Sequence, residues 1–145
     1  MIRSLLAIVA VALGTTAAVA QQDPIDARQK IMKANSAQAK IGAAMVKGEA
    51  PFDLAKAKHI FVVYQEGAGK LGGLFPPNSK TGHDTTAAPK IWEDMADFKA
   101  HIAKLANEAK AAEAAVKDFD SFKAQFGMVQ KNCGGCHRTY RIKKS

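Results

Sequence analysis

Cysteine and proline are both scarce in this sequence, and each shortage narrows the choice of structure. Two cysteines among 145 residues cannot supply the two ligand pairs of a structural zinc site. The five prolines gather with the glycines at a few breaks, which leaves long stretches free to form helices. The best candidate strand, Ile60 to Tyr64, follows an Ala/Lys-rich stretch and is interpreted as buried helix. The sequence therefore predicts an all-α protein.

Long apolar runs are absent except at the N-terminus. Residues 1–20 carry one positive charge, Arg3, then an apolar run from Leu5 to Leu13 and small residues ending in Ala20. This order is typical of a cleaved secretory signal peptide. The run is shorter than the roughly 20 residues that a membrane-spanning helix needs. We expect cleavage after Ala20, which leaves residues 21–145 as one exported domain in the periplasm.

Both cysteines lie in one pentapeptide, Cys133-Gly134-Gly135-Cys136-His137, and this pattern is typical of c-type haem attachment. In a helix the three reactive side chains would emerge from one face, because they are three and four residues apart. The thiols would hold the haem as thioethers and the imidazole would be an axial ligand of the iron. A thioredoxin-like disulfide would follow a strand in a βαβ pattern, which is missing. The sequence predicts one covalently bound haem c.

Four amphipathic helices are predicted from the spacing of apolar residues. Their expected ranges are 24–46, 52–66, 89–116 and a last helix that starts near Asp118 as its N-cap. The cysteines occupy the core stripe of the last helix. Mostly short connections then predict an up-down-up-down antiparallel four-helix bundle with the haem in its core. A long loop, residues 71–88, is of a length that is usually functional or mobile.

Height along the bundle limits the candidates for the second axial ligand. Laying the helices antiparallel puts Met32 and Met95 level with His137. Met45 lies near the opposite end, and Met128 falls outside the core stripe of its helix. Spacing alone leaves Met32 and Met95 open, and either methionine could simply fill the core.

Other side chains near the predicted haem level have weaker assignments. Trp92, one turn into the third helix, is expected to pack against the haem. Tyr140 continues the core stripe of the last helix and is expected to contact the haem too. The remaining histidines, His59, His83 and His101, receive no role, because a lone histidine is more often solvated or hydrogen-bonded than bound to metal. No acid/base constellation occurs on the haem-facing stripes, so no enzyme is predicted.

With the haem motif near the C-terminus and a four-helix bundle around it, residues 21–145 resemble the class II c-type cytochromes, the cytochrome c' family. The resemblance is carried by residues 28–33 (Arg-Gln-Lys-Ile-Met-Lys), 74–76 (Leu-Phe-Pro), 89–92 (Pro-Lys-Ile-Trp) and the haem motif continued by Tyr140-Arg141. Family members with Arg-Gln-x-x-Met-Lys form the low-spin branch, in which the methionine binds iron. The resemblance therefore selects Met32 as the ligand opposite His137.

The same resemblance implies further properties. Arg28, four residues before Met32 on one helix face, is implied to lie near a haem propionate. The implied function is a periplasmic single-electron carrier with His/Met-ligated haem. The alternative is a high-spin, five-coordinate cytochrome c' that binds NO or CO, with Met32 only packing over the iron. Members of the family include monomers and homodimers.

Acidic residues are outnumbered by basic ones, which gives the whole chain a formal net charge of +8. Removal of Arg3 with the leader would lower this charge to +7. The lysines are spread along the chain and do not form a stripe with interleaved aromatics, so no nucleic-acid binding is predicted. We expect the charge to steer the protein toward an acidic redox partner or an anionic membrane surface.

Overall fold

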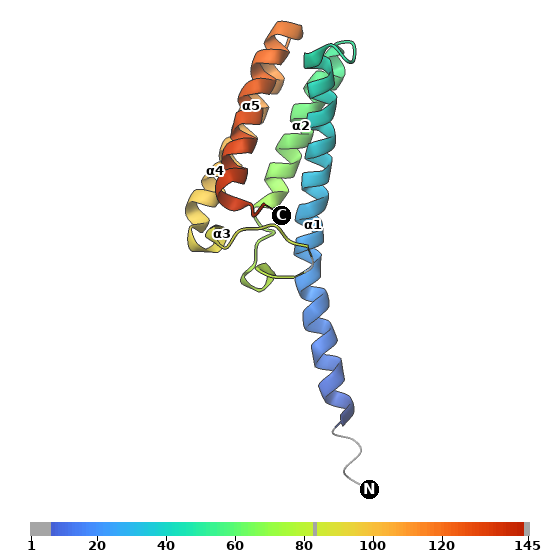
Figure 1. Ribbon diagram of the computed structural model, residues 1–145, viewed down its shortest axis with the longest axis vertical. Coiled ribbons are helices and arrows are strands. Elements are labelled where there is room, and N and C mark those ends of the chain that lie inside the picture. Colours follow the sequence, from blue (N-terminus) through green and yellow to red (C-terminus); the bar gives the residue numbers. More distant parts are fainter. Residues whose placement is uncertain (1–6, 83, 144–145) are drawn as a thin grey trace.

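The computed structural model describes residues 7–82 and 84–143, which form a bundle of long helices (Figure 1). The bundle helices are α1 (Ala7–Lys47), α2 (Leu54–Leu71), α4 (Met95–Ala115) and α5 (Phe119–Tyr140). The chain runs up α1, down α2, up α4 and down α5 (Figure 1). This arrangement confirms the predicted all-α, up-down-up-down bundle. None of the helices in the described ranges combines the length and the hydropathy that crossing a membrane requires.

Two short helices lie between α2 and α4. The 3₁₀ helix η1 (Pro77–Ser79) interrupts the long loop, and α3 (Lys90–Glu93) follows it. Within the described part of the chain, the single isolated β-bridge pairs Ala87 with Arg141 in antiparallel fashion. The end of the long loop is therefore paired with the residue that directly follows α5.

The first helix begins well before the predicted start at Pro24, and its N-terminal part extends beyond the bundle (Figure 1). The preceding residues are rich in alanine, the strongest helix former, so α1 continues without a break through the proline. Residues 1–6 of the predicted signal peptide lie outside the described residues. The helix ends as predicted at Gly48, whose positive φ of 75° suits a glycine.

The second helix is longer than the predicted range 52–66. It begins after Asp53, whose carboxylate caps the first turn by accepting a backbone N–H at 2.9 Å. It continues through Gly67 to Leu71. The glycine is needed for close packing on α1, because a Cβ atom there would come within 3.0 Å of Ile31. Packing against a neighbouring helix thus outweighs the low helix propensity of glycine.

The predicted third helix, residues 89–116, is broken into α3 and α4 at Asp94. This residue leaves the helical region with φ −135° and ψ 60°, and its carboxylate accepts the backbone N–H of Asp97 at 3.4 Å. Asp94 therefore caps a new helix, and Met95 is the first residue of α4. Asp118 caps α5 as predicted, in a capping box with Ser121.

The apolar side chains form two clusters along the bundle axis. The closed-end cluster is built around Met45, Ala57, Ile60, Phe61, Tyr64, Ala109, Ala112, Val116, Phe122, Phe126 and Val129. The loop-end cluster has Ala68, Leu71, Ile91, Phe98, Ile102 and Tyr140 at its centre, with Ile31, Met32, Phe75, Trp92, Met95 and Cys136 among the partly buried residues packed on it. The second cluster lies at the end of the bundle where the long loop and the haem motif meet.

Candidate haem-attachment site

The two cysteines project into the bundle from the last turns of α5. Cys133 packs against the closed-end cluster and Cys136 against the loop-end cluster, and both are free thiols. Burial raises the pKa of both thiols because a thiolate is poorly solvated there. They therefore stay neutral at pH 7. A neutral thiol carries the hydrogen that accompanies sulfur when it adds across a vinyl double bond to form a thioether.

His137 projects from the stripe of α5 that faces α1. Phe126, Cys133 and His137 are separated by seven and four residues and so lie along one face of the helix. Phe126 packs so closely on α1 that a Cβ atom at Gly42 would overlap its ring. Three turns further along the same stripe, His137 is exposed. The imidazole is thus aimed at the side of α5 where α1 lies.

The contact between Gly42 and Phe126 also sets the register of the two helices. Met32 precedes Gly42 by ten residues, or about 15 Å, and His137 follows Phe126 by eleven residues, or about 16.5 Å. Because α1 and α5 run antiparallel (Figure 1), the two side chains lie at the same height. Met32 packs on the loop-end cluster, on which Cys136 and Met95 also pack. Met32 therefore lies at the height of His137 and on the same cluster as one cysteine of the motif.

Met95 lies at a different height, which corrects the prediction that it is level with His137. Phe98 of α4 packs on Tyr140 of α5, with ring centroids 5.1 Å apart. Met95 is three residues before Phe98, and His137 is three residues before Tyr140. In antiparallel helices these displacements add to an offset of about 9 Å. The prediction failed because α4 starts anew at Met95 and does not continue a helix from Pro89.

A hollow of about 420 Å³ opens beside the imidazole and is lined by Gly134, His137, Arg138, Arg141 and Lys143. A Cβ atom at Gly134 would meet no atom within 4 Å, so the motif leaves open space there. The three cations in the lining suit the carboxylates of a haem. Partial desolvation, and secondarily the charge of Arg141, lower the pKa of His137, which favours the neutral imidazole that binds iron. These residues fit a covalently attached haem.

Arg28 has a role that the sequence reasoning missed. It is only 5% exposed. Its Nη1 atom donates to the Leu74 carbonyl at 3.1 Å and to the Ser79 hydroxyl at 3.0 Å. Its Nη2 atom donates to the Ser79 carbonyl at 2.9 Å and to the Thr85 hydroxyl at 2.7 Å. Both terminal nitrogens thus bind the long loop, and the predicted contact with a haem propionate stays a prediction.

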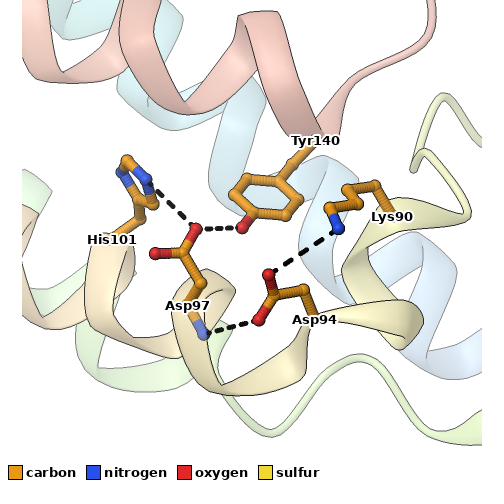
Figure 2. A network of polar contacts seen from close by, with 5 residues as sticks. All are labelled: Lys90, Asp94, Asp97, His101 and Tyr140. Carbon is orange, nitrogen blue, oxygen red and sulfur yellow. Dashed lines mark hydrogen bonds and ion pairs between the residues drawn. The ribbon is translucent and has the colours of Figure 1, made fainter.

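Trp92 and Tyr140, the other predicted haem contacts, also take part in structural hydrogen bonds. The Trp92 indole donates to the Phe75 carbonyl at 3.0 Å. The hydroxyl of Tyr140 donates to Asp97, which lies between the tyrosine and His101 (Figure 2). This bond raises the pKa of Tyr140 to about 12. Whether either side chain touches the haem stays a prediction, and both lie in the loop-end cluster with Met32 and Cys136.

The remaining histidines and methionines lie away from this site or have other contacts. His59 is exposed, and His83 lies outside the described residues. The Nε2 atom of His101 lies 3.6 Å from the Asp97 carboxylate. Met45 is buried in the closed-end cluster, while Met128 is 41% exposed.

A four-helix bundle whose last helix carries Cys-x-x-Cys-His on its inner side defines a class II c-type cytochrome. The sequence model described as Cytochrome C' matches residues 23–141, and the chain belongs to that family. Membership in this family, together with the motif, confirms that the protein binds one covalently attached haem c.

Similar proteins support the assignment over nearly the whole chain. The chain is 48% identical over 135 residues to a cytochrome c' of Rhodopseudomonas palustris, covering 93% of this chain and 92% of the relative. It is 34% identical to cytochrome c-556 of the same organism, over 99% of each chain. A solved structure of Rhodopseudomonas palustris cytochrome c' matches with a TM-score of 0.82 and 47% identity, covering 85% of this chain and 98% of that one.

Proposed function

We propose that this protein is an exported single-electron carrier whose haem iron is bound by His137 and Met32. The family consists of electron carriers and gas-binding proteins and not of enzymes. The observation that carries the proposal is the register of α1 on α5, in which the contact of Gly42 with Phe126 places Met32 level with His137.

Each side chain has a distinct task in this proposal. The bound haem supplies the couple between ferric and ferrous iron. Cys133 and Cys136 would hold the haem on α5 as thioethers, and His137 would bind its iron as a neutral imidazole. Met32 would bind the iron through its soft thioether, which favours the ferrous state. Binding by both residues would suit electron transfer, because it would leave no room on the iron for a gas.

A second candidate function is binding of a small diatomic gas at a five-coordinate iron. One observation favours it: Met32 packs on the apolar loop-end cluster, so packing alone gives it a reason to be there. The relatives do not decide between the two functions, since they include both a cytochrome c' and a cytochrome c-556. In this alternative Met32 covers the iron without binding it.

The proposed location and partner follow from the leader and the charge. Cleavage of the signal peptide after Ala20 would release residues 21–145 to the periplasm. It would also place Pro24 in the first turn of α1, where a missing N–H costs no hydrogen bond. The net charge of +7 on that product suits docking to an acidic redox partner, or to an anionic membrane surface that holds one. The carrier acts as a monomer or a homodimer.

Two measurements on the purified protein test the proposal. On a denaturing gel, haem stain should run with the polypeptide, and haem that acidified organic solvent extracts from the wild type would refute thioether attachment. The Cys133→Ala, Cys136→Ala double variant is the control and should carry no stain. An optical spectrum of the ferric protein should be low-spin with a near-red thioether-to-iron charge-transfer band. A high-spin spectrum would instead favour the gas-binding function.

A further inference from the structure

Residues 74–79 and 85–88, named the strap here, run between α1 and α5. The strap is fastened to α1 by Arg28, whose guanidinium donates four hydrogen bonds to it, at 2.7 to 3.1 Å. The hydroxyl and the carbonyl of Ser79 both accept from this group, and Ser79 is fully buried. The guanidinium also lies 4.7 Å from the centroid of the Phe75 ring. Burial lowers the pKa of Arg28, but an arginine stays charged at neutral pH.

The other end of the strap is fastened to the segment that follows the haem motif. The backbone N–H of Ala88 donates to the Tyr140 carbonyl at 3.0 Å, and the N–H of Ile142 donates to the Thr86 carbonyl at 2.8 Å. The side chain of Tyr140 is held separately by Asp97 of α4 (Figure 2). The last turn of α5 is therefore tied to both the strap and α4.

A row of side chains connects the two fastenings through the interior. Phe75 of the strap lies under Arg28 and packs on Phe98 of α4, with ring centroids 4.7 Å apart. Phe98 packs in turn on Tyr140, at 5.1 Å. The row leads from the helix that carries Met32, through the strap and α4, to the helix that carries the haem motif. All three aromatic residues belong to the loop-end cluster on which Met32 packs.

We propose that Arg28 is a positioning residue which, through the strap, holds Met32 at its working distance from His137. The inference rests on the proposed function and deepens it. Arg28 and Met32 are four residues apart and so lie on one face of α1. The close contact of α1 with α5 at Gly42 is about 15 Å away from Met32. Arg28 and the strap supply the second attachment that keeps α1 from moving away from α5 at the level of the iron.

The experiment compares holoprotein variants at Arg28 with a matched control. Arg28→Gln removes the positive charge and the two donor nitrogens of the guanidinium. Arg28→Lys keeps the charge, but the single terminal nitrogen of lysine cannot reach both Ser79 and Thr85. Lys30→Gln is the control, because this exposed lysine lies on the same helix and its replacement removes the same charge. The readouts are the near-red band, the rate of CO binding to ferrous protein, and hydrogen exchange at the amides of Ala88 and Ile142.

We expect Arg28→Gln to weaken the near-red band, speed CO binding by about tenfold or more, and speed exchange at both amides. A tenfold change corresponds to the loss of roughly one hydrogen bond from a charged donor. Arg28→Lys should give the same changes to a lesser degree, and Lys30→Gln should give none. Faster amide exchange without any change in the band or in CO binding would overturn the positioning role, and so would three unchanged readouts.

A second variant and a second readout cover the cases in which Arg28→Gln does not fold or Met32 does not bind iron. If Arg28→Gln does not fold, Thr85→Val removes one acceptor of the same guanidinium and should shift the readouts in the same direction. A wild-type ferric protein without the near-red band would refute ligation of the iron by Met32. The positioning role of Arg28 would then be tested by CO binding alone. Arg28→Gln should still speed CO binding, because in that case Met32 covers the iron without binding it. Unchanged CO binding in that case would overturn it.

Discussion

Cys133, Cys136 and His137 lie within five consecutive residues, yet the surroundings of the two thiols differ from those of the imidazole. The two thiols point into different apolar clusters, and burial raises the pKa of both. The imidazole lies at the open hollow among cations, where its pKa is lowered. A single helical turn can thus present two neutral thiols and one neutral nitrogen base to the same ligand.

Tyr140 gives a prediction for stability at high pH. Its hydrogen bond to Asp97 raises its pKa to about 12, from an ordinary value of 10.0. Because the folded state holds the proton more tightly, the stabilisation is fully present below pH 10 and is lost as the pH rises toward 12. Tyr140→Phe should therefore unfold at lower denaturant concentration than the wild type at pH 8, and the difference should shrink by pH 11.5. Urea denaturation at both pH values measures it.

Tyr64→Phe is the companion variant, because burial raises the pKa of Tyr64 to about 12 as well. Its hydroxyl accepts a hydrogen bond from the Gln130 side chain at 3.1 Å, whereas the hydroxyl of Tyr140 donates to Asp97. Both variants should flatten the alkaline loss of stability. A stability difference between wild type and Tyr140→Phe that stays constant from pH 8 to pH 11.5 would contradict the linkage to Asp97.

The residues proposed to bind haem are easier to find in the sequence than those that hold the site together. Cys133, Cys136 and His137 form a local pattern, and local spacing is enough to place them on one face. The partners of Arg28 lie 46 to 57 residues away along the chain, and no pattern in the sequence marks Leu74, Ser79 or Thr85 as acceptors. Its part in fastening the loop follows from the fold alone.

Among the helices, the close approach of α1 and α5 depends on one glycine. A Cβ atom at Gly42 would overlap the ring of Phe126, which is almost fully buried and has little room to move. We expect Gly42→Ala to lower the free energy of unfolding by about 1 to 3 kcal/mol through overpacking. It should also weaken the near-red band, because the same contact sets the height of Met32. Urea denaturation and the ferric spectrum measure the two effects.

Gly127→Ala is the matched control for that change. Gly127 also lies inside a bundle helix, but a Cβ atom there would meet nothing within 4 Å. Alanine should therefore raise stability by up to about 1 kcal/mol, the usual difference in helix propensity between the two residues. If Gly42→Ala stabilised the protein as Gly127→Ala should, the close contact of α1 with α5 would be wrong.

The number, order and direction of the bundle helices could be predicted because the apolar stripes are long and regular. The boundaries were less accurate, and each error has an identifiable cause. Asp94 looks like any acidic residue on a helix surface until its side chain is seen to cap α4. Gly67 suggested an end to α2, but its place against Ile31 of α1 keeps it inside the helix. The first error comes from a local cap, and the second from tertiary packing, which spacing does not encode.

At the scale of the whole molecule, positive charge gathers where the haem motif meets the surface. Arg138, Arg141 and Lys143 line the hollow beside His137 and are all exposed. An acidic redox partner that docks over them would approach the proposed site by a short route. Electron exchange with such a partner should slow as ionic strength rises, since exposed charges are screened beyond about 10 Å at 0.1 M salt.

Variants in which basic side chains are replaced by uncharged glutamine test where this docking surface lies. Arg138→Gln with Lys143→Gln should slow the exchange at low salt and make its rate less dependent on salt. Lys123→Gln removes one charge from an exposed position near the opposite end of the same helix and should change little. Stopped-flow rates between 10 mM and 500 mM salt measure both effects. A wild-type rate that does not vary with salt would exclude electrostatic docking.

Ligation of the iron by Met32 is the central claim, and the ferric optical spectrum of Met32→Ala beside that of Met95→Ala tests it most directly. The account predicts that Met32→Ala loses the near-red band and turns high-spin, since the sixth position is then open. Met95→Ala, about 9 Å off the level of His137, should keep the band and lose only about 2 to 5 kcal/mol of stability through its packing. A band that survives in Met32→Ala and disappears in Met95→Ala would contradict the account.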